Sequence, residues 1–103
     1  MDNMLQNTDV RPTHYKETSL ECRDVMRIMF GDVEYMYFCM MNAFKYLWRH
    51  RQKGEKTDLE KAMWYINEAG DIAVKAGITP PVELEGMNTI LKQEMDKYAE
   101  HEK

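Results

Sequence analysis

Four polar side chains, Asn42, Lys45, Arg49 and Lys53, follow one another at spacings of three and four residues. At about 100° per residue, this spacing places all four on one side of a helix. Arginine binds phosphate through two parallel hydrogen bonds, and lysine supplies a compact positive charge. The row therefore predicts a helical surface that binds anions such as phosphate groups.

Aromatic residues accompany this row. Phe38 and Tyr35 precede it by one and two turns, respectively, on the same side of the helix. In the next helical segment, Lys61 and Trp64 fall opposite the apolar side, together with Glu68. An exposed tryptophan leaves a large apolar ring in water, so we expect the N-terminal segment, a second subunit or a ligand to cover Trp64.

Two simpler explanations compete with ligand binding. Lysine and arginine on the outer side of a helix are usually solvated surface, and cations near a helix C-terminus also interact favourably with its dipole. The dipole accounts for Arg49, Arg51 and Lys53 better than for Lys45. For both tryptophans, packing or an oligomer interface is a more frequent role than stacking on a ligand.

Helical periodicity runs from Thr18 onward, without strand alternation. We therefore predict an all-α fold, a small bundle of about four helices preceded by a flexible N-terminal arm. The arm covers residues 1–13, and a single helical domain covers residues 14–103. The predicted helices are residues 19–30, 33–52 and 58–75, and a fourth that begins at Pro80-Pro81.

Capping residues and glycines set the predicted helix boundaries. Thr18 with Glu21 matches a capping box, and Thr57 with Glu60 repeats the pattern. Asp32 is the expected cap of the second helix. A glycine follows each of the first three helices and is expected to end it.

Apolar residues at helical spacing predict the buried side of each helix. In helix order these residues are Leu20, Val25, Ile28 and Met29; Val33, Met36, Met40, Phe44 and Leu47; Leu59, Met63, Ile66, Gly70 and Ala73; and Leu84, Met87, Leu91, Met95 and Tyr98. The last set is narrow, as is typical of a helix that packs on one neighbour or on another subunit. The small residues of the third helix permit close approach by a neighbouring helix.

The 103-residue chain has a formal net charge of −4, which argues against general nucleic-acid binding because that requires a basic surface. No apolar run approaches the roughly 20 residues of a membrane span, and the N-terminus lacks the apolar core of a signal peptide. Cys22 and Cys39 lack paired spacing, so we expect two reduced, buried thiols. These features predict a cytoplasmic protein without a membrane partner.

Familiar signatures of catalysis and metal binding are absent from the sequence. It contains no glycine-rich phosphate loop, no dinucleotide fingerprint and no Cys/His metal spacing, so no metal ligands are assigned. His14 and Tyr15 are candidates for hydrogen bonding to a ligand, although a packing hook is the commoner role of such a segment. Glu21 and Asp24 are cap or surface residues that, in a weaker interpretation, hold Mg²⁺ through water.

Four segments of the chain carry recognisable motifs: THYK at 13–16, LECRDVM at 20–26, FCMMNAFKYLWRHRQKG at 38–54 and DLEKAMWYIN at 58–67. Together they resemble the SaV-like family of bacteriophage and prophage proteins. The positions that match the family pattern are His14, Tyr15, Glu21, Asn42, Lys45, Tyr46, Trp48, Arg49, Lys53, Asp58, Lys61, Ala62, Trp64 and Tyr65. Two positions depart from it: Met41 replaces a common glycine, and Arg23 replaces a usual isoleucine.

Many members of that family are labelled phage nucleotide kinases, and most have no known function. The resemblance therefore implies a nucleotide-binding phage or prophage protein in the host cytoplasm. In its enzymatic form it implies a nucleoside-monophosphate kinase without a phosphate loop, with Mg²⁺ accompanying the nucleotide. The resemblance assigns no catalytic residue, and His14 and Asp58 are guesses for orienting the attacking phosphate.

In this hypothesis the cations of the row neutralise phosphates, a lysine approaches from the next helix, and an aromatic ring such as Trp64 or Tyr15 stacks on the base. The candidate ligand-binding residues are His14, Tyr15, Asn42, Lys45, Tyr46, Arg49, Lys53, Lys61 and Trp64. An alternative is a non-enzymatic accessory protein that binds a host protein or forms a homo-oligomer. A third hypothesis is sequestration of a nucleotide without turnover.

Overall fold

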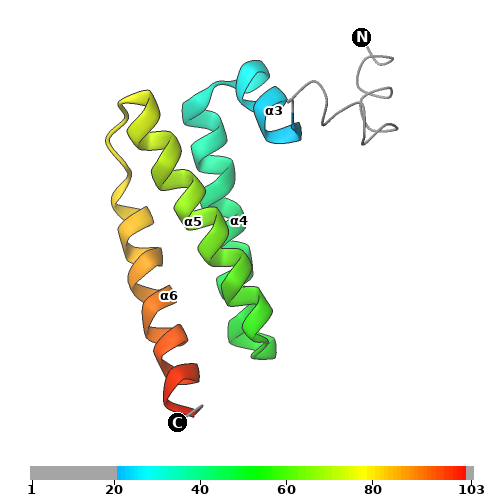
Figure 1. Ribbon diagram of the computed structural model, residues 1–103, viewed down its shortest axis with the longest axis vertical. Helices are drawn as coiled ribbons and strands as arrows, with labels where there is room; N and C mark the ends of the chain where they lie inside the picture. Colours follow the sequence, from blue (N-terminus) through cyan, green and yellow to red (C-terminus); the bar gives the residue numbers. More distant parts are fainter. Residues whose placement is uncertain (1–20, 102–103) are drawn as a thin grey trace. The chain divides into compact units, whose positions relative to one another are not determined.

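The computed structural model describes residues 21–101, and their regular elements are all helices (Figure 1). In chain order these are α3 (Cys22–Phe30), α4 (Asp32–Lys53), α5 (Lys56–Ala76) and α6 (Val82–His101). The chain divides into two units between Gly31 and Asp32, and each unit is described by itself. The all-α class is confirmed for the described residues, whereas the predicted arm, residues 1–13, lies outside them.

The helix α3 begins later than its sequence predicts. Glu21 is its N-cap, with an extended backbone at φ −111° and ψ 162°. The Glu21 N–H donates to Oδ2 of Asp24 at 3.0 Å, so the carboxylate that closes this cap lies three residues after Glu21. The predicted inclusion of Glu21 in the helix is therefore wrong, while Thr18 lies outside the described residues. Gly31 ends the helix as predicted.

No residue of α3 is buried. Ile28 and Met29, which the periodicity placed on a buried side, are exposed, and Val25 is partly exposed. A nine-residue helix has an apolar stripe but cannot bury it without a partner. The thiol of Cys22 is also exposed, contrary to expectation, whereas that of Cys39 is buried, and both cysteines are free.

The helices α4 and α5 form an antiparallel pair joined by a short turn (Figure 1). Gly54 makes this turn in the left-handed region, at φ 73°, and its N–H donates to the carbonyl of His50 at 2.7 Å. Glu55 is the N-cap of α5, so Thr57 lies inside the first helical turn. The predicted capping box of Thr57 with Glu60 is therefore wrong. Gly77 ends α5 in the left-handed conformation, as predicted.

Small residues line the contact between α4 and α5. The fully buried residues at the centre of this unit are Met36, Cys39, Ala43, Leu59, Ala62, Ala69, Ile72 and Ala73. Alanine at this contact lets the two backbones approach closely, while the larger side chains fill the space on either side. Gly70 does not share this role, because a methyl group built on it would meet no atom within 4 Å.

The buried side of α4 is rotated by roughly a quarter of a turn from the predicted one. Val33 and Phe44 are exposed, and Tyr35 and Cys39 are buried in their place. The prediction was wrong because α4 carries apolar residues around most of its circumference, so periodicity alone does not select one side. Met63 of α5, also expected in the core, is exposed as well.

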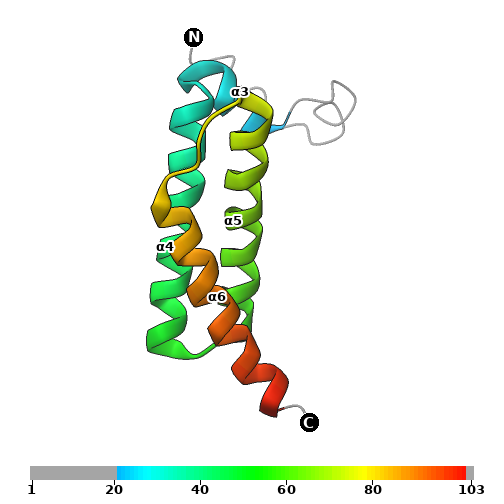
Figure 2. The same cartoon turned by 90° about the vertical axis from the view of Figure 1, so that its left-hand side faces the viewer.

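The helix α6 packs chiefly on α5 and touches α4 less extensively. It crosses the α4–α5 pair obliquely, after the segment 77–81 has led away from the end of α5 (Figure 2). Its predicted stripe is confirmed, since Leu84 and Leu91 are buried and the other three members are partly buried. Among the described helices, none has the length and hydropathy that crossing a bilayer requires.

Candidate functional site

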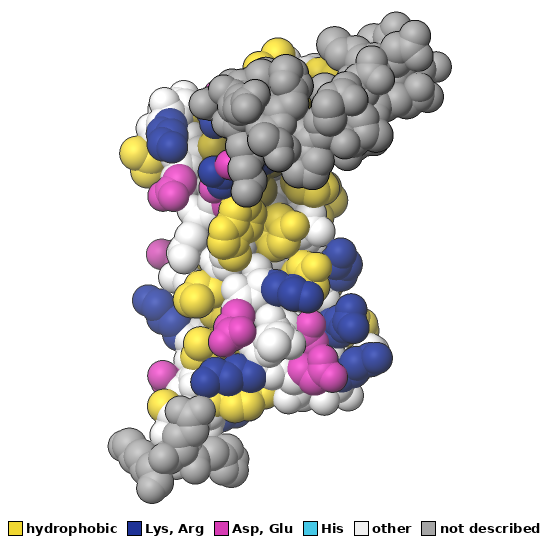
Figure 3. All heavy atoms as spheres, turned by 45° about the vertical axis from the view of Figure 1, so that its right-hand side comes forward, with side chains coloured by type: hydrophobic (Ala, Val, Ile, Leu, Met, Phe, Trp, Pro, Cys, Tyr) yellow, Lys and Arg dark blue, Asp and Glu magenta, His cyan; other side chains and the backbone are white. Residues whose placement is uncertain are grey.

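A group of cations and rings occupies the side of the α4–α5 pair that faces away from α6. We call it the basic–aromatic face, and its residues are Lys45, Tyr46 and Arg49 of α4 and Lys61, Trp64 and Tyr65 of α5. Figure 3 views the molecule from this side and shows lysine and arginine side chains interspersed with hydrophobic and acidic ones. The positive charge is therefore local, in keeping with the acidic total of the chain.

Two lysines from different helices converge on one ring. The Nζ atom of Lys45 lies 4.8 Å from the centroid of the Tyr46 ring, and that of Lys61 lies 5.4 Å from the same centroid. The ring quadrupole attracts both ammonium groups, and this attraction offsets part of their mutual repulsion. Packing of α4 on α5 thus brings together two charges that are 16 residues apart in the sequence.

Aromatic rings form a wall beside the two lysines. Tyr46 and Tyr65 stack with their centroids 6.0 Å apart and their planes at 13°. Trp64 meets Tyr65 edge-on at 5.1 Å, and Phe38 does so at 6.4 Å. Burial, followed by the neighbouring Tyr46, raises the pKa of Tyr65 above that of an ordinary tyrosine, whose hydroxyl is already protonated at neutral pH. The wall therefore offers both flat surfaces and a hydroxyl donor.

Arg49 is held beside this wall by a buried carboxylate. Its Nε atom lies 3.7 Å from Oδ1 of Asp58, whose side chain is only 3% exposed. The Oδ2 atom of Asp58 is buried without a hydrogen-bond partner, so the nearby guanidinium supplies compensation that the carboxylate needs. Arg49 itself is about half exposed and keeps much of its guanidinium accessible to solvent.

Other predicted residues of the row are placed differently. Asn42 is partly buried and donates from Nδ2 to the carbonyl of Phe38 at 3.0 Å, within its own helix. Lys53 is the exposed last residue of α4. Tyr35 is buried, contrary to its predicted place on the outward side, and its hydroxyl donates to Oε2 of Glu68 at 2.8 Å. Burial first, and this bond second, raise the pKa of Tyr35.

The other residues predicted to bind a ligand or Mg²⁺ are not part of the basic–aromatic face among the described residues. His14 and Tyr15 lie outside it. Glu21 and Asp24 cap α3, and Glu21 also lies 3.7 Å from Nε of Arg23, so their carboxylates serve local structure. Across residues 21–101, no three His, Cys, Asp or Glu side chains gather as metal ligands would. The described residues therefore do not build a magnesium site of their own.

The periodicity did not reveal a second polar cluster, which joins α6 to the end of the α4–α5 pair. The buried His50 has its Nε2 atom 2.8 Å from the Tyr98 hydroxyl, and that hydroxyl donates to the carbonyl of Gly54 at 2.7 Å. Because the single proton of Tyr98 is used on Gly54, His50 donates from Nε2. The sequence did not indicate that His50 is buried, because its neighbours in the sequence are basic residues typical of an exposed surface.

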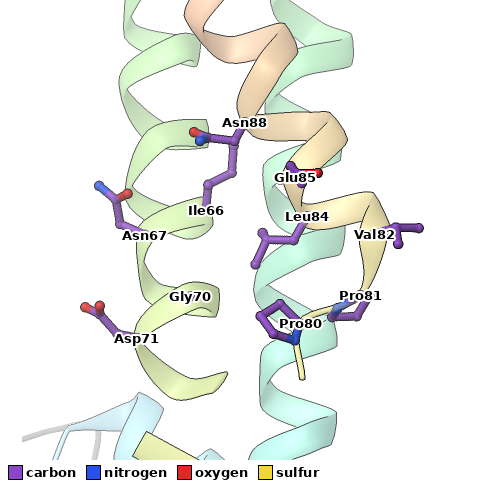
Figure 4. Close-up of a pocket in the computed structure, with 10 residues that line it drawn as sticks. All are labelled: Ile66, Asn67, Gly70, Asp71, Pro80, Pro81, Val82, Leu84, Glu85 and Asn88. Carbon is purple, nitrogen blue, oxygen red and sulfur yellow. The ribbon is translucent and has the colours of Figure 1, made fainter. Parts of the chain in front are cut away.

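A groove of about 560 Å³ lies between α5 and the segment Pro80–Asn88 (Figure 4). Pro80 and Leu84 project toward α5, whereas Val82 points away from it. Polar side chains that also line it are Asn67, Asp71, Glu85 and Asn88. None of the predicted ligand-binding residues lines this groove, and the sequence signal for it is Gly70, whose missing side chain leaves the space open.

The fold and the site define a small helical protein with a cationic, aromatic face between two antiparallel helices. Residues 10–67 match the family described as a protein of unknown function, DUF3310. The match covers more than half of the chain, so the protein belongs to this family. It includes the whole basic–aromatic face and excludes α6. No curated protein and no solved structure matches the chain.

Proposed function

We propose that the protein binds a nucleotide on the basic–aromatic face, with the phosphates against Lys45 and Lys61. The observation that carries this proposal is the convergence of these two ammonium groups, from two helices, on the ring of Tyr46. The sequence resemblance to the SaV-like phage and prophage family supports the same ligand class. We propose, on that resemblance alone, that the protein acts in a phage-infected or prophage-carrying cell.

The arrangement suits a phosphate chain because its cations are already in place. Charge-assisted hydrogen bonds from lysine and arginine to phosphate are shorter and stronger than neutral ones. Asp58 holds Arg49 beside the two lysines, so the guanidinium loses little freedom when it binds an oxygen. Phosphate binding thus relieves the repulsion among cations that folding has brought together.

The aromatic wall suits a nucleobase. Stacking of one base on an aromatic side chain contributes about 1–3 kcal/mol and tolerates different bases. The side chain of Trp64 is 48% exposed and lies at the edge of the Tyr46–Tyr65 stack. A mononucleotide fits this combination better than a polynucleotide, because the basic surface is confined to a few residues of an acidic chain.

The geometry supports binding more directly than phosphoryl transfer. Asp58, one guess for orienting an attacking phosphate, is buried and held against Arg49, so it does not face solvent. Any Mg²⁺ would arrive with the nucleotide, since the described residues form no magnesium site. Sequestration and kinase activity therefore share the same binding face and differ only in what becomes of the ligand.

Isothermal titration with nucleoside mono- and triphosphates tests the proposal. We expect Lys45→Ala and Lys61→Ala each to weaken binding about tenfold, because each removes one charge-assisted contact. Lys92→Ala, at an exposed position on α6, is the matched control and should bind as the unmodified protein does. Unchanged affinity in both face variants, or no binding by the unmodified protein, contradicts the proposal.

A second measurement separates sequestration from turnover. The protein is incubated with a nucleoside monophosphate, a nucleoside triphosphate and Mg²⁺, and the nucleotides are then separated by ion-exchange chromatography. Recovery of both nucleotides intact indicates sequestration, whereas formation of two diphosphates indicates a kinase.

A further inference from the structure

An exposed row of large apolar residues runs along the side of α4 away from the basic–aromatic face. We call it the apolar stripe, and its members are Tyr37, Met41, Phe44 and Trp48, which are 45%, 65%, 58% and 52% exposed. Neither α5 nor α6 covers it. The rings of Phe44 and Trp48 stack on each other with centroids 6.2 Å apart, which makes the stripe continuous.

The spacing of the stripe is that of a helix that pairs along its length. Its members are separated by four, three and four residues. This alternation is the repeat of core positions in a coiled coil, where each side chain inserts between those of a facing helix. The same spacing lets all four side chains contact one facing helix.

The stripe is also symmetric about its own midpoint, between Asn42 and Ala43. If a second α4 lies antiparallel against the first about this point, Tyr37 faces Trp48 of the second copy. Continuing the same register outward by one position, Glu34 faces Arg51 of the second copy. Both end residues are exposed, so the two ends of the stripe carry opposite charges that match each other.

We propose that two copies of the chain associate through antiparallel pairing of α4 along the apolar stripe. A two-fold axis passes through the midpoint, so every contact occurs twice, as in an isologous interface. Pairing removes four large apolar side chains per copy from water and brings Glu34 and Arg51 together at both ends. This contact lies on a different side of α4 from the basic–aromatic face, so it does not depend on the proposed function.

The charge pattern selects a second copy in this orientation. Within one chain, Glu34 and Arg51 are 17 residues apart, about 25 Å along the helix, and cannot pair with each other. In a parallel pair, each would face its own like charge. An antiparallel second copy is thus the arrangement in which both end charges are matched.

Sedimentation velocity of the full chain, over a range of concentrations, tests the proposal through charge exchange. Glu34→Lys and Arg51→Glu are each expected to raise the dissociation constant about tenfold, because each turns two attractive contacts per dimer into repulsive ones. An equimolar mixture of the two variants should recover the dimer. In the mixed pair, the introduced lysine faces the introduced glutamate at one end, and the unchanged Arg51 faces the unchanged Glu34 at the other. The double variant should recover the dimer as well.

Matched controls separate this effect from net charge and from folding. Glu83→Lys and Lys92→Glu make the same charge changes at exposed positions of α6 and should leave the dimer intact. Met41→Lys should abolish it, whereas Val74→Lys, at a residue of α5 that is 81% exposed, should not. Far-ultraviolet circular dichroism confirms that each variant keeps its helical content.

Three outcomes overturn the proposal. One is an unmodified protein that stays monomeric over the whole concentration range. Another is association of Met41→Lys as strong as that of the unmodified protein, which places the interface elsewhere. The third is failure of the mixed charge variants to recover the dimer, which excludes the antiparallel register.

Discussion

The two exposed sides of α4 differ in what fixes their side chains. On the basic–aromatic face, contacts cross from α4 to α5: Lys61 reaches the ring of Tyr46, and Tyr65 stacks on it. On the apolar stripe, the ring contact joins Phe44 and Trp48, which belong to the same helix. The first side is organised by tertiary packing, and the second is presented by one helix alone.

In the two proposals, one helix serves two kinds of recognition. Charges need neighbours at fixed distances, because electrostatic stabilisation depends on geometry that is set before the ligand arrives. An apolar stripe needs only a rigid helix and a register, because hydrophobic association is non-directional and scales with the area buried. The predictions below test whether the two sides depend on structure in these different ways.

Removing a core side chain should have the largest effect. Leu59 is fully buried on α5, where it packs between the helices, so Leu59→Ala should lower the free energy of unfolding by about 2–5 kcal/mol. Val74→Ala, at an exposed position of the same helix, should change it by less than about 0.5 kcal/mol. Urea unfolding followed by circular dichroism measures both. A similar small loss in both variants would show that the α4–α5 contact is not the source of stability.

Measuring nucleotide binding and self-association on the same variants tests whether the two sides of α4 act independently. Lys61→Ala should weaken nucleotide binding about tenfold and leave the sedimentation coefficient unchanged, because Lys61 lies on α5 and away from the stripe. Met41→Lys should do the reverse. Titration calorimetry and sedimentation velocity on the same two samples give both readouts. Loss of both properties in either variant would mean that the two sides are coupled.

High pH should lower the stability of the folded chain through the buried Tyr35. In the unfolded chain this tyrosine loses its proton near pH 10, whereas burial and the bond to Glu68 raise its pKa and keep it protonated to higher pH in the folded chain. The folded state then binds more protons, so the free energy of unfolding falls above about pH 10, by up to about 1.4 kcal/mol per pH unit. Urea unfolding between pH 9 and about 11 measures this slope. Tyr35→Phe should have a shallower slope, and an equal slope would exclude Tyr35 as its source.

Loss of the Tyr35 hydroxyl should have the smallest effect on the free energy of unfolding at neutral pH. Tyr35→Phe removes the 2.8 Å bond to Glu68 and should lower the free energy of unfolding by about 0.5–1.5 kcal/mol. Tyr37→Phe, which makes the same change on the exposed stripe, should alter it by less. Thermal unfolding by circular dichroism measures both variants. A larger effect at Tyr37 would place more of the tyrosine-dependent stability on the stripe than on the α5-facing side.

Several features of the fold were predictable because they depend on local chemistry. Gly31, Gly54 and Gly77 end their helices with positive φ angles that other residues rarely adopt. The pair Pro80-Pro81 directly precedes α6, and the carbonyl of Pro81 accepts the Leu84 N–H at 3.0 Å. These signals act within a few residues of the chain, so a single sequence contains them in full.

Part of the candidate site was also predictable. Helical spacing placed Lys45 and Arg49 on one side of α4 and Lys61 and Trp64 on one side of α5. It did not show that Asp58 would be buried against Arg49, because a carboxylate in the first turn of a helix is usually a surface residue. It also missed the bond between His50 and Tyr98, since the two residues are 48 positions apart.

The sequence by itself determined that the chain forms helices, where three of them end and which residues of α6 face inward. Tertiary structure decided which side of α4 is buried, because close approach to α5 favours the side that carries Cys39 and Ala43 over the bulkier Phe44. That choice moved Tyr35 into the core and left the apolar stripe outside. Helical periodicity measures how apolar each side is, whereas packing also depends on the shape of the helix it meets.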